Sequence, residues 1–305
     1  MNRFTLLAAG VALAGIAYAA EPIPSGFELT LVDMQGQRKV LGTLPRSVVA
    51  PRVSPDGTRV AFEMTEEGVP PPNTRPYVAE LDKLDKKRAL QPTLLITRNV
   101  SPVWSHDSDW TAFVSIGNGT DSIFWQRADG YIQPKYLVDG RAPDGLYAGG
   151  LLAFITLTGD KDYGISLMNI GTKQITRIDQ PGSAQHSSEI SPDGKWIAYT
   201  SDETARPEVW LQSMEQPSTR VQLTTQGGSH PQWSPDGASL YYDQGGKLFR
   251  IDVTRDAQLP KASEPVPLPI TGFQQTDMRR QYDLTPDGKG FVMLFLAKAQ
   301  RSAAL

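Results

Sequence analysis

One short turn sequence recurs along this chain, and its spacing limits the possible folds more than any other feature. In full it reads Ser or Thr followed by Pro-Asp-Gly, and it lies between two short apolar runs. Copies begin at Ser54, Ser105, Ser191, Ser234 and Thr285, so the gaps are 51, 86, 43 and 51 residues. Because 86 is twice 43, the pattern predicts a sixth copy that has lost its signature.

The second half of the sixth copy is recognisable. Leu152-Ala153-Phe154-Ile155 matches Ile197-Ala198-Tyr199-Thr200, which places the lost turn near residues 146–150. The preceding Ala142-Pro143-Asp144-Gly145 is interpreted as a displaced remnant of that turn. Six repeats of 40–50 residues are typical of a β-propeller, which predicts an all-β, six-bladed propeller.

Each repeat carries four short β-prone segments, as one propeller blade requires. The N-terminal segments at 27–33 and 39–41 have no first and second strand before them. The C-terminal segments at 281–284 and 291–296 have no third and fourth strand after them. We therefore expect the two ends to combine into one blade and to close the ring without a free sheet edge.

The repeated aspartates are predicted to be turn residues and not catalytic acids. In this turn Ser accepts a backbone N–H, Pro fixes φ, Asp bonds nearby amides and Gly accepts a positive φ. Asp193, taken alone, resembles a general acid, but Asp56, Asp236 and Asp287 occupy the same place. His106 stands where the other copies have proline, so it too is interpreted as a turn residue.

Composition narrows the class of protein. The 30 basic and 33 acidic side chains leave no electrostatic footprint for nucleic acid, and no cysteine is present for a disulfide, a thiolate nucleophile or a thiolate metal site. Arg3, an apolar run at 4–16 and Ala17-Tyr18-Ala19 form a signal-peptide pattern. We expect a signal peptide at 1–19, cleaved after Ala19 or alternatively after Ala20. One propeller domain at 20–305 would then lie in the periplasm or be secreted, with no transmembrane segment.

The turn and the strand after it, as in Trp233-Ser234-Pro235-Asp236-Gly237, resemble the TolB-like propeller repeats, which also occur in prolyl-oligopeptidase-type peptidases. The resemblance covers about 27–296 and implies a fold more specifically than a function. TolB carries an α/β domain before its propeller, whereas only 20–26 precede the first strand expected here. No Gly-x-Ser-x-Gly elbow of the peptidases is present.

The first strand of each blade lines a propeller's channel, so candidate ligand-binding residues are sought there. The expected channel-mouth set is Arg52, Arg98, His186, Glu189, His230, Gln232, Arg280 and Asp283. Oligogalacturonate-lyase-like propellers resemble this repeat and hold a divalent metal with channel histidines. That resemblance implies a partial metal site at His186, Glu189 and His230, with His106 expected on the opposite face. The alternative is that these groups bond strand ends and channel water.

The sequence favours an exported, non-catalytic binding or scaffold propeller of the bacterial envelope. Its expected partner is a protein, peptide or glycan, met as a monomer at the face that bears the first-strand entrances and the loop at 66–76. No catalytic residue and no cofactor is assigned beyond the possible divalent metal. The competing hypothesis is a metal-dependent polysaccharide lyase or hydrolase around His186, Glu189 and His230. A third possibility is a structural propeller whose ligand leaves no recognisable residues.

Overall fold

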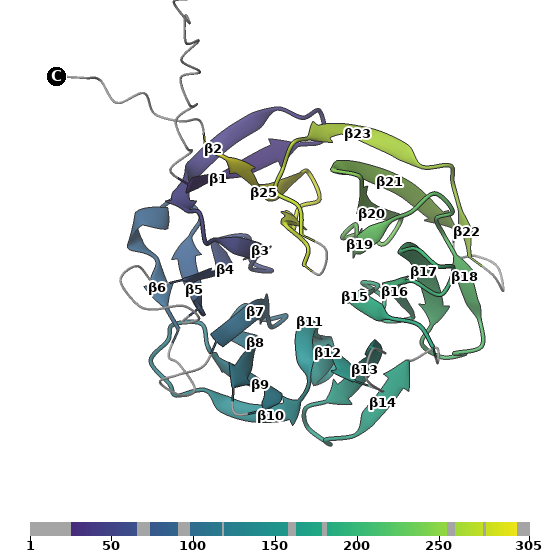
Figure 1. Ribbon diagram of the computed structural model, residues 1–305, viewed down its shortest axis with the longest axis horizontal. Coiled ribbons are helices and arrows are strands. Elements are labelled where there is room, and N and C mark those ends of the chain that lie inside the picture. The colour runs from purple at the N-terminus through teal and green to yellow at the C-terminus, as the bar shows by residue number, and fades with distance from the viewer. Residues whose placement is uncertain are drawn as a thin grey trace, which may run out of the picture.

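Five four-stranded antiparallel sheets and one of five strands surround a central channel in the computed structural model (Figure 1). The structure describes residues 26–65, 74–90, 98–117, 119–157, 163–178, 182–254, 260–276 and 279–297. The first strand of each blade is innermost, as the labels β3, β7, β11, β15 and β19 in Figure 1 show. The predicted all-β six-bladed propeller is confirmed. The predicted signal peptide at 1–19 lies outside the described residues.

The first three blades follow one another in the sequence. Blade one contains β3 (Val49–Val53), β4 (Arg59–Thr65), β5 (Thr74–Glu80) and β6 (Arg88–Ala89), with the 3-10 turn η1 (Leu84–Lys86) between the last two. Blade two contains β7 (Arg98–Trp104), β8 (Trp110–Gly117), β9 (Thr120–Arg127) and β10 (Lys135–Asp139). Blade three contains β11 (Arg141–Tyr147), η2 (Ala148–Gly150), β12 (Leu151–Leu157), β13 (Tyr163–Asn169) and β14 (Ile175–Ile178).

The fourth and fifth blades differ at their outer edges. Blade four contains β15 (Gln185–Ile190), β16 (Trp196–Ser201), β17 (Glu208–Ser213) and β18 (Arg220–Gln222). Blade five contains β19 (Ser229–Trp233), β20 (Ser239–Gln244), β21 (Lys247–Thr254), β22 (Lys261–Ala262) and β23 (Val266–Thr271). Both β22 and β23 pair with β21, so two short segments share the outer position of this blade.

The sixth blade joins the two ends of the chain, as predicted. It contains β24 (Tyr282–Leu284) and β25 (Gly290–Leu296) from the C-terminal side, with β1 (Gly26–Asp33) and β2 (Arg38–Pro45) from the N-terminal side. Phe27 pairs with Leu296 and Asp33 with Gly290 along an uninterrupted antiparallel register. This pairing closes the ring and leaves no unpaired edge between first and last strands.

The turn chemistry predicted from the repeat is confirmed in each visible copy. In the fourth blade the Ser191 hydroxyl donates to Asp193 at 2.6 Å and accepts the Trp196 amide at 3.0 Å. Gly194 has a φ of +73°. At the second blade Ser108 takes the glycine position with a φ of +64°, and its amide donates to the Ser105 carbonyl, so His106 is a turn residue as expected.

Hydrogen bonds within these turns show that the aspartates have a structural role. The Thr285 hydroxyl and the Lys289 amide lower the pKa of Asp287, and the Ser234 hydroxyl and the Ala238 amide lower that of Asp236. A carboxyl whose ionised form is stabilised in this way is a poor proton donor near neutral pH.

The third blade departs from the prediction at one point. The lost turn is found where expected, at η2, where Gly149 and Gly150 have φ of +74° and +72°. The interpretation of Ala142–Gly145 as a turn remnant is wrong, because these residues lie within β11. Gly145 pairs with Ala153 of the second strand. It therefore occupies the repeat position of Arg52, which pairs with Ala61, and of Glu189, which pairs with Ala198.

A bulge in the first strand recurs around the ring. In blades one, two, four and five the first strand has one more residue than the paired stretch of the second strand. The bulged residue has a positive φ although it is not glycine. These residues are Ala50, Ser101, Ser187 and His230, with φ of 54–56°. Blade three gains two residues between Arg141 and Gly145. The additional residue turns the Asp144 carboxylate toward the channel, where the site below uses it.

The core lies between neighbouring blades. Five of the six second strands contribute a fully buried aromatic ring at the same repeat position, and the sixth contributes a methionine. These residues are Phe62, Phe113, Phe154, Tyr199, Tyr242 and Met293, each at most 2% exposed. In the part of the chain that the structure describes, no helix is long and apolar enough to cross a membrane.

Candidate functional site

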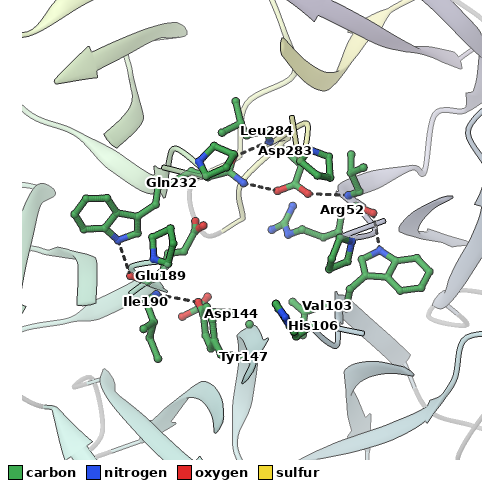
Figure 2. A pocket seen from close by; sticks show the side chains of 18 of the residues that line it. Arg52, Val103, His106, Asp144, Tyr147, Glu189, Ile190, Gln232, Asp283 and Leu284 are labelled. Carbon is green, nitrogen blue, oxygen red and sulfur yellow. Dashed lines mark hydrogen bonds between the residues drawn. The ribbon is translucent and has the colours of Figure 1, made fainter. Parts of the chain in front are cut away.

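A hollow of about 350 Å³ opens at the end of the channel where the Pro-Asp-Gly turns lie. We call this end the turn face and the hollow the turn-face well. Four turn prolines and His106 surround its mouth, and the prolines are Pro55, Pro192, Pro235 and Pro286. Figure 2 shows the side chains of Arg52, Asp144, Glu189 and Asp283 around its centre.

The floor of the well contains Arg52, Asp144 and Arg280. All three also line a hollow of about 30 Å³ on the far side, at the face where the first strands begin. They therefore form a partition across the channel. The face where the first strands begin is called the entrance face below.

The walls of the well are joined from blade to blade by hydrogen bonds. Asp283 accepts the Val53 amide at 2.7 Å and Gln232 accepts the Leu284 amide at 2.9 Å. These two side chains therefore seal the joints on either side of the closing blade. The alternative interpretation of the channel residues, that they bond strand ends, holds for both of them.

Aromatic side chains form hydrogen bonds between neighbouring blades at three other joints. The indole of Trp104 donates to the Arg52 carbonyl at 2.8 Å, and that of Trp233 donates to the Glu189 carbonyl at 3.2 Å. The Tyr147 hydroxyl accepts the Ile190 amide at 3.1 Å, because Gly145 leaves room for the ring beside it. Figure 2 shows these contacts as dashed lines around the well, which is consequently a rigid frame.

Arg280 spans the well between blades. Its Nη1 donates to Glu189 of the fourth blade at 2.9 Å, and its Nη2 donates to Asp283 of its own blade at 2.7 Å. Its Nε donates to the Tyr282 carbonyl at 3.1 Å. Although burial opposes it, Asp283 and Glu189 keep the pKa of Arg280 above its usual value, so this side chain is a permanently charged strut.

Asp144 supports the neighbouring bulge. One carboxylate oxygen accepts both the amide of Ser188 at 2.8 Å and its hydroxyl at 2.7 Å. In the second and fifth blades the amide of the bulged residue is likewise held from the preceding blade, since Glu63 accepts the Ser101 amide and Thr200 the His230 amide. A bulge amide that leaves the sheet ladder needs such an acceptor when it is buried.

Burial changes the acidity of the two carboxyls in the well. It raises the pKa of Glu189 to about 7, against the pull of Arg280. It raises the pKa of Asp144 to about 6, against the bonds from Ser188. Both carboxyls therefore change charge near neutral pH, and the well carries less negative charge than its residue count suggests.

Five of the predicted channel-mouth residues line this well, namely Arg52, Glu189, Gln232, Arg280 and Asp283. Three others, Arg98, His186 and His230, do not line it. Sequence reasoning missed Asp144 and Tyr147, because the third blade lacks the turn that aligned the other repeats. The one sequence signal for Asp144 was that its Pro-Asp-Gly lies out of step with the spacing of the other repeats.

The two histidines meet as predicted, but away from the well. Their ring centroids lie 5.8 Å apart, and both side chains are buried. His230 Nδ1 bonds Asp243 at 2.7 Å, and burial together with His230 lowers the pKa of His186 to about 3. Glu189 instead binds Arg280, and the described residues contain no group of three His, Asp or Glu side chains able to hold a metal ion. The metal site stays a prediction.

The predicted interaction surface and the larger channel hollow lie at different ends. The interaction surface was predicted at the entrance face, where the hollow in the channel has a volume of about 30 Å³. The hollow on the turn face has a volume of about 350 Å³. Of the loop at 66–76 that was expected to reach over the entrance, residues 66–73 lie outside the described residues, and 74–76 belong to β5. His106 lines the mouth of the turn-face well, opposite to the histidine pair, as expected.

Comparison with solved structures agrees on the fold. A putative TolB from Agrobacterium tumefaciens superposes with a TM-score of 0.67 at 18% identity, covering 88% of this chain and 98% of that one. TolB from Acinetobacter baumannii gives 0.59 at 18% identity, covering 81% of this chain and 65% of that one. A chain of the nidogen–laminin complex gives 0.58 at 12% identity, covering 90% and 100%.

These likenesses establish the fold, which is that of the TolB propeller and of other six-bladed propellers. No protein-family model matches the sequence. No curated protein matches it either.

Proposed function

We propose that this chain is an exported, non-catalytic binding module of the bacterial envelope that holds a protein, peptide or glycan segment in the turn-face well. The supporting observation is the well itself, a concave site of about 350 Å³ with fixed walls and charged groups converging on its floor. Export rests on the signal-peptide pattern at 1–19, and the periplasm suits a chain without cysteine.

The hydroxyls at the well favour binding over catalysis. The Ser234 hydroxyl donates to Asp236 and that of Thr285 donates to Asp287, so both belong to the turns. Neither is paired with a histidine as an activated nucleophile would be. The carboxyl groups are likewise engaged, Glu189 and Asp283 with Arg280 and Asp144 with Ser188.

Site-specific photo-crosslinking tests the proposal. A photo-reactive phenylalanine replaces His106 at the mouth, or Lys195 on the same face but outside the well, and the chain is expressed in a Gram-negative envelope. We expect the probe at position 106 to capture a discrete adduct, which mass spectrometry identifies, and the probe at position 195 to capture it weakly. Equal capture at both positions, or stronger capture at position 195, would contradict the proposal.

The lyase or hydrolase alternative depends on the metal site at His186, Glu189 and His230. Elemental analysis of the purified protein tests it, with the variants His186→Ala and His230→Ala as controls. Stoichiometric Mn, Zn or Ca that is lost in both variants would support the enzyme. A metal-free protein would remove the alternative.

A further inference from the structure

Arg52 differs from every other charged group on the floor of the turn-face well. Its Nη1 donates to two carbonyl oxygens, of Pro51 at 2.8 Å and of Arg280 at 3.0 Å. Its Nε is buried and has no hydrogen-bond partner within the described part of the chain. Arg280, by contrast, is bonded to two carboxylates. The well therefore contains one saturated arginine and one with unused donor capacity.

The hydrogen bonds of Arg52 go only to neutral carbonyls, so its partly buried guanidinium has no charged hydrogen-bond partner. Burial and the neighbouring Arg280 lower the pKa of Arg52 to about 10, although Asp283, Asp144 and Glu189 oppose that shift. Those three carboxylates are already engaged with Arg280 and Ser188. The group that would satisfy Arg52 is consequently an anion from outside the chain.

We propose that the ligand of the well is a polypeptide segment that places a carboxylate on Arg52. This inference rests on the proposed function and specifies its chemistry. The planar fork of arginine matches a carboxylate, and a charge-assisted bond of this kind is about twice as strong as a neutral one. The carboxylate is supplied either by a free chain end or by an acidic side chain.

A groove that continues from the well favours a polypeptide over an acidic sugar. It shares Val53, Thr285 and Pro286 with the well and runs outward between the sixth and first blades, with a volume of about 810 Å³. Its apolar lining comes from Leu31, Leu41, Leu81 and Val292. Apolar side chains next to the anchoring carboxylate would bury against this lining, whereas hydroxyl groups of a sugar would lose hydrogen bonds there.

The charged residues of the groove also discriminate between possible ligands. Four aspartates and two lysines line it, namely Asp33, Asp56, Asp82, Asp287, Lys39 and Lys289. The acidic excess disfavours a polyanion along the groove and suits a segment whose negative charge is confined to the group on Arg52. A uronate polymer carries one carboxylate on each sugar and fits this arrangement poorly.

Four small probes test the proposal on the purified chain. The first is acetyl-Ala-Leu-Ala-Leu with a free carboxylate, and the second is the same peptide as its C-terminal amide. The third is acetyl-Ala-Leu-Asp-Leu-amide, which moves the carboxylate to a side chain, and the fourth is digalacturonate. Titrations to millimolar concentration are followed by NMR in the wild type and in Arg52→Gln, His106→Trp and the matched Lys195→Trp. Backbone amide resonances report binding in all four proteins, and the Arg52 Nε–H resonance adds a local report in those that keep Arg52.

We expect the free acid, the aspartyl peptide or both to bind roughly tenfold or more tightly than the amide. Arg52→Gln should abolish that preference, and the stronger of the two acids identifies the source of the carboxylate. Equal binding of acids and amide, or tighter binding of digalacturonate, overturns the inference, as does the absence of any saturable shift. If acids and amide bind equally and His106→Trp weakens both while Lys195→Trp does not, the binding well stands and only the carboxylate assignment fails. If His106→Trp leaves tight acid binding intact, the turn-face site itself is wrong.

Discussion

Arg280 Nη1 donates to the carboxylate of Glu189 at 2.9 Å, although the two residues are 91 positions apart and belong to the sixth and fourth blades. The fifth blade lies between them, and Arg280 also contacts its Pro231 carbonyl at 3.4 Å. One side chain thus ties three blades together across the channel, close to the seam where the chain ends meet. The turn-face well and the ring closure therefore share one electrostatic network.

Removing the Glu189 side chain should lower the unfolding free energy more than removing only its charge. At pH 8, above the raised pKa of about 7, Glu189→Ala removes one partner of a largely buried ion pair and is expected to cost about 1–3 kcal/mol of unfolding free energy. Glu189→Gln keeps a carbonyl acceptor for Arg280 and should cost less. Urea unfolding at constant m-value measures both, and an alanine variant as stable as the wild type would show that Arg280 is held by Asp283 alone.

Asp144 should prove to be a structural residue of the fourth-blade bulge. Asp144→Ala leaves the Ser188 amide without its acceptor and is expected to destabilise by about 1–3 kcal/mol, whereas Asp144→Asn retains one oxygen and should cost less. Hydrogen exchange at the Ser188 amide reports the effect locally. Unchanged protection at that amide in the alanine variant would contradict the role assigned to the carboxylate.

Burial of His186 predicts that acid destabilises the fold. The pKa of His186 is lowered to about 3 in the folded chain, so the unfolded chain binds a proton that the folded chain does not as pH falls below 6.5. Its contribution destabilises the fold between pH 6.5 and about 3. Asp144 and Glu189, whose pKa values are raised, act in the opposite direction as pH falls.

Comparison of wild type with His186→Gln separates these contributions. Between pH 7 and pH 4 the variant should gain up to roughly 3 kcal/mol relative to the wild type. Denaturant midpoints measured at both pH values check this difference. Parallel pH profiles for the two proteins would mean that His186 takes up its proton without unfolding.

A side chain at the turn glycine Gly194 should be disfavoured by backbone geometry alone. Gly194 has a φ of +73° and open space where an alanine methyl group would lie, so Gly194→Ala should cost about 1–2 kcal/mol through strain without a clash. Gly171 is the matched control, because it is also exposed, its φ is not positive and a Cβ would meet nothing nearer than 3.4 Å. Thermal melting of the two variants should differ, and equal midpoints would contradict the turn assignment.

Export predicts a shortened chain in the envelope. If the pattern at 17–19 is a cleavage site, the mature protein should begin at Ala20, or at Glu21 if cleavage follows Ala20. N-terminal sequencing or intact mass of the protein recovered from a periplasmic extract measures this. Recovery of the full chain with Met1 in place would refute cleavage, and Ala17→Arg with Ala19→Arg should block it.

The blade count and the ring closure could be predicted from the sequence, as could the turn roles of Asp193 and its counterparts. These features are local and repeated, so hydroxyl, proline, carboxylate and glycine act over five or six residues and spacing alone reveals them.

Which channel residues act together could not be predicted from the sequence, because it depends on contacts between blades. A two-residue bulge moved Asp144 out of an apparent turn and onto the floor of the well. Glu189 was drawn to Arg280 and away from the histidines, because an arginine 91 residues later in the chain reaches it across the channel. Such pairings depend on how six blades are arranged around one axis, and no local pattern in the chain encodes the direction of a side chain relative to blades that are distant in sequence.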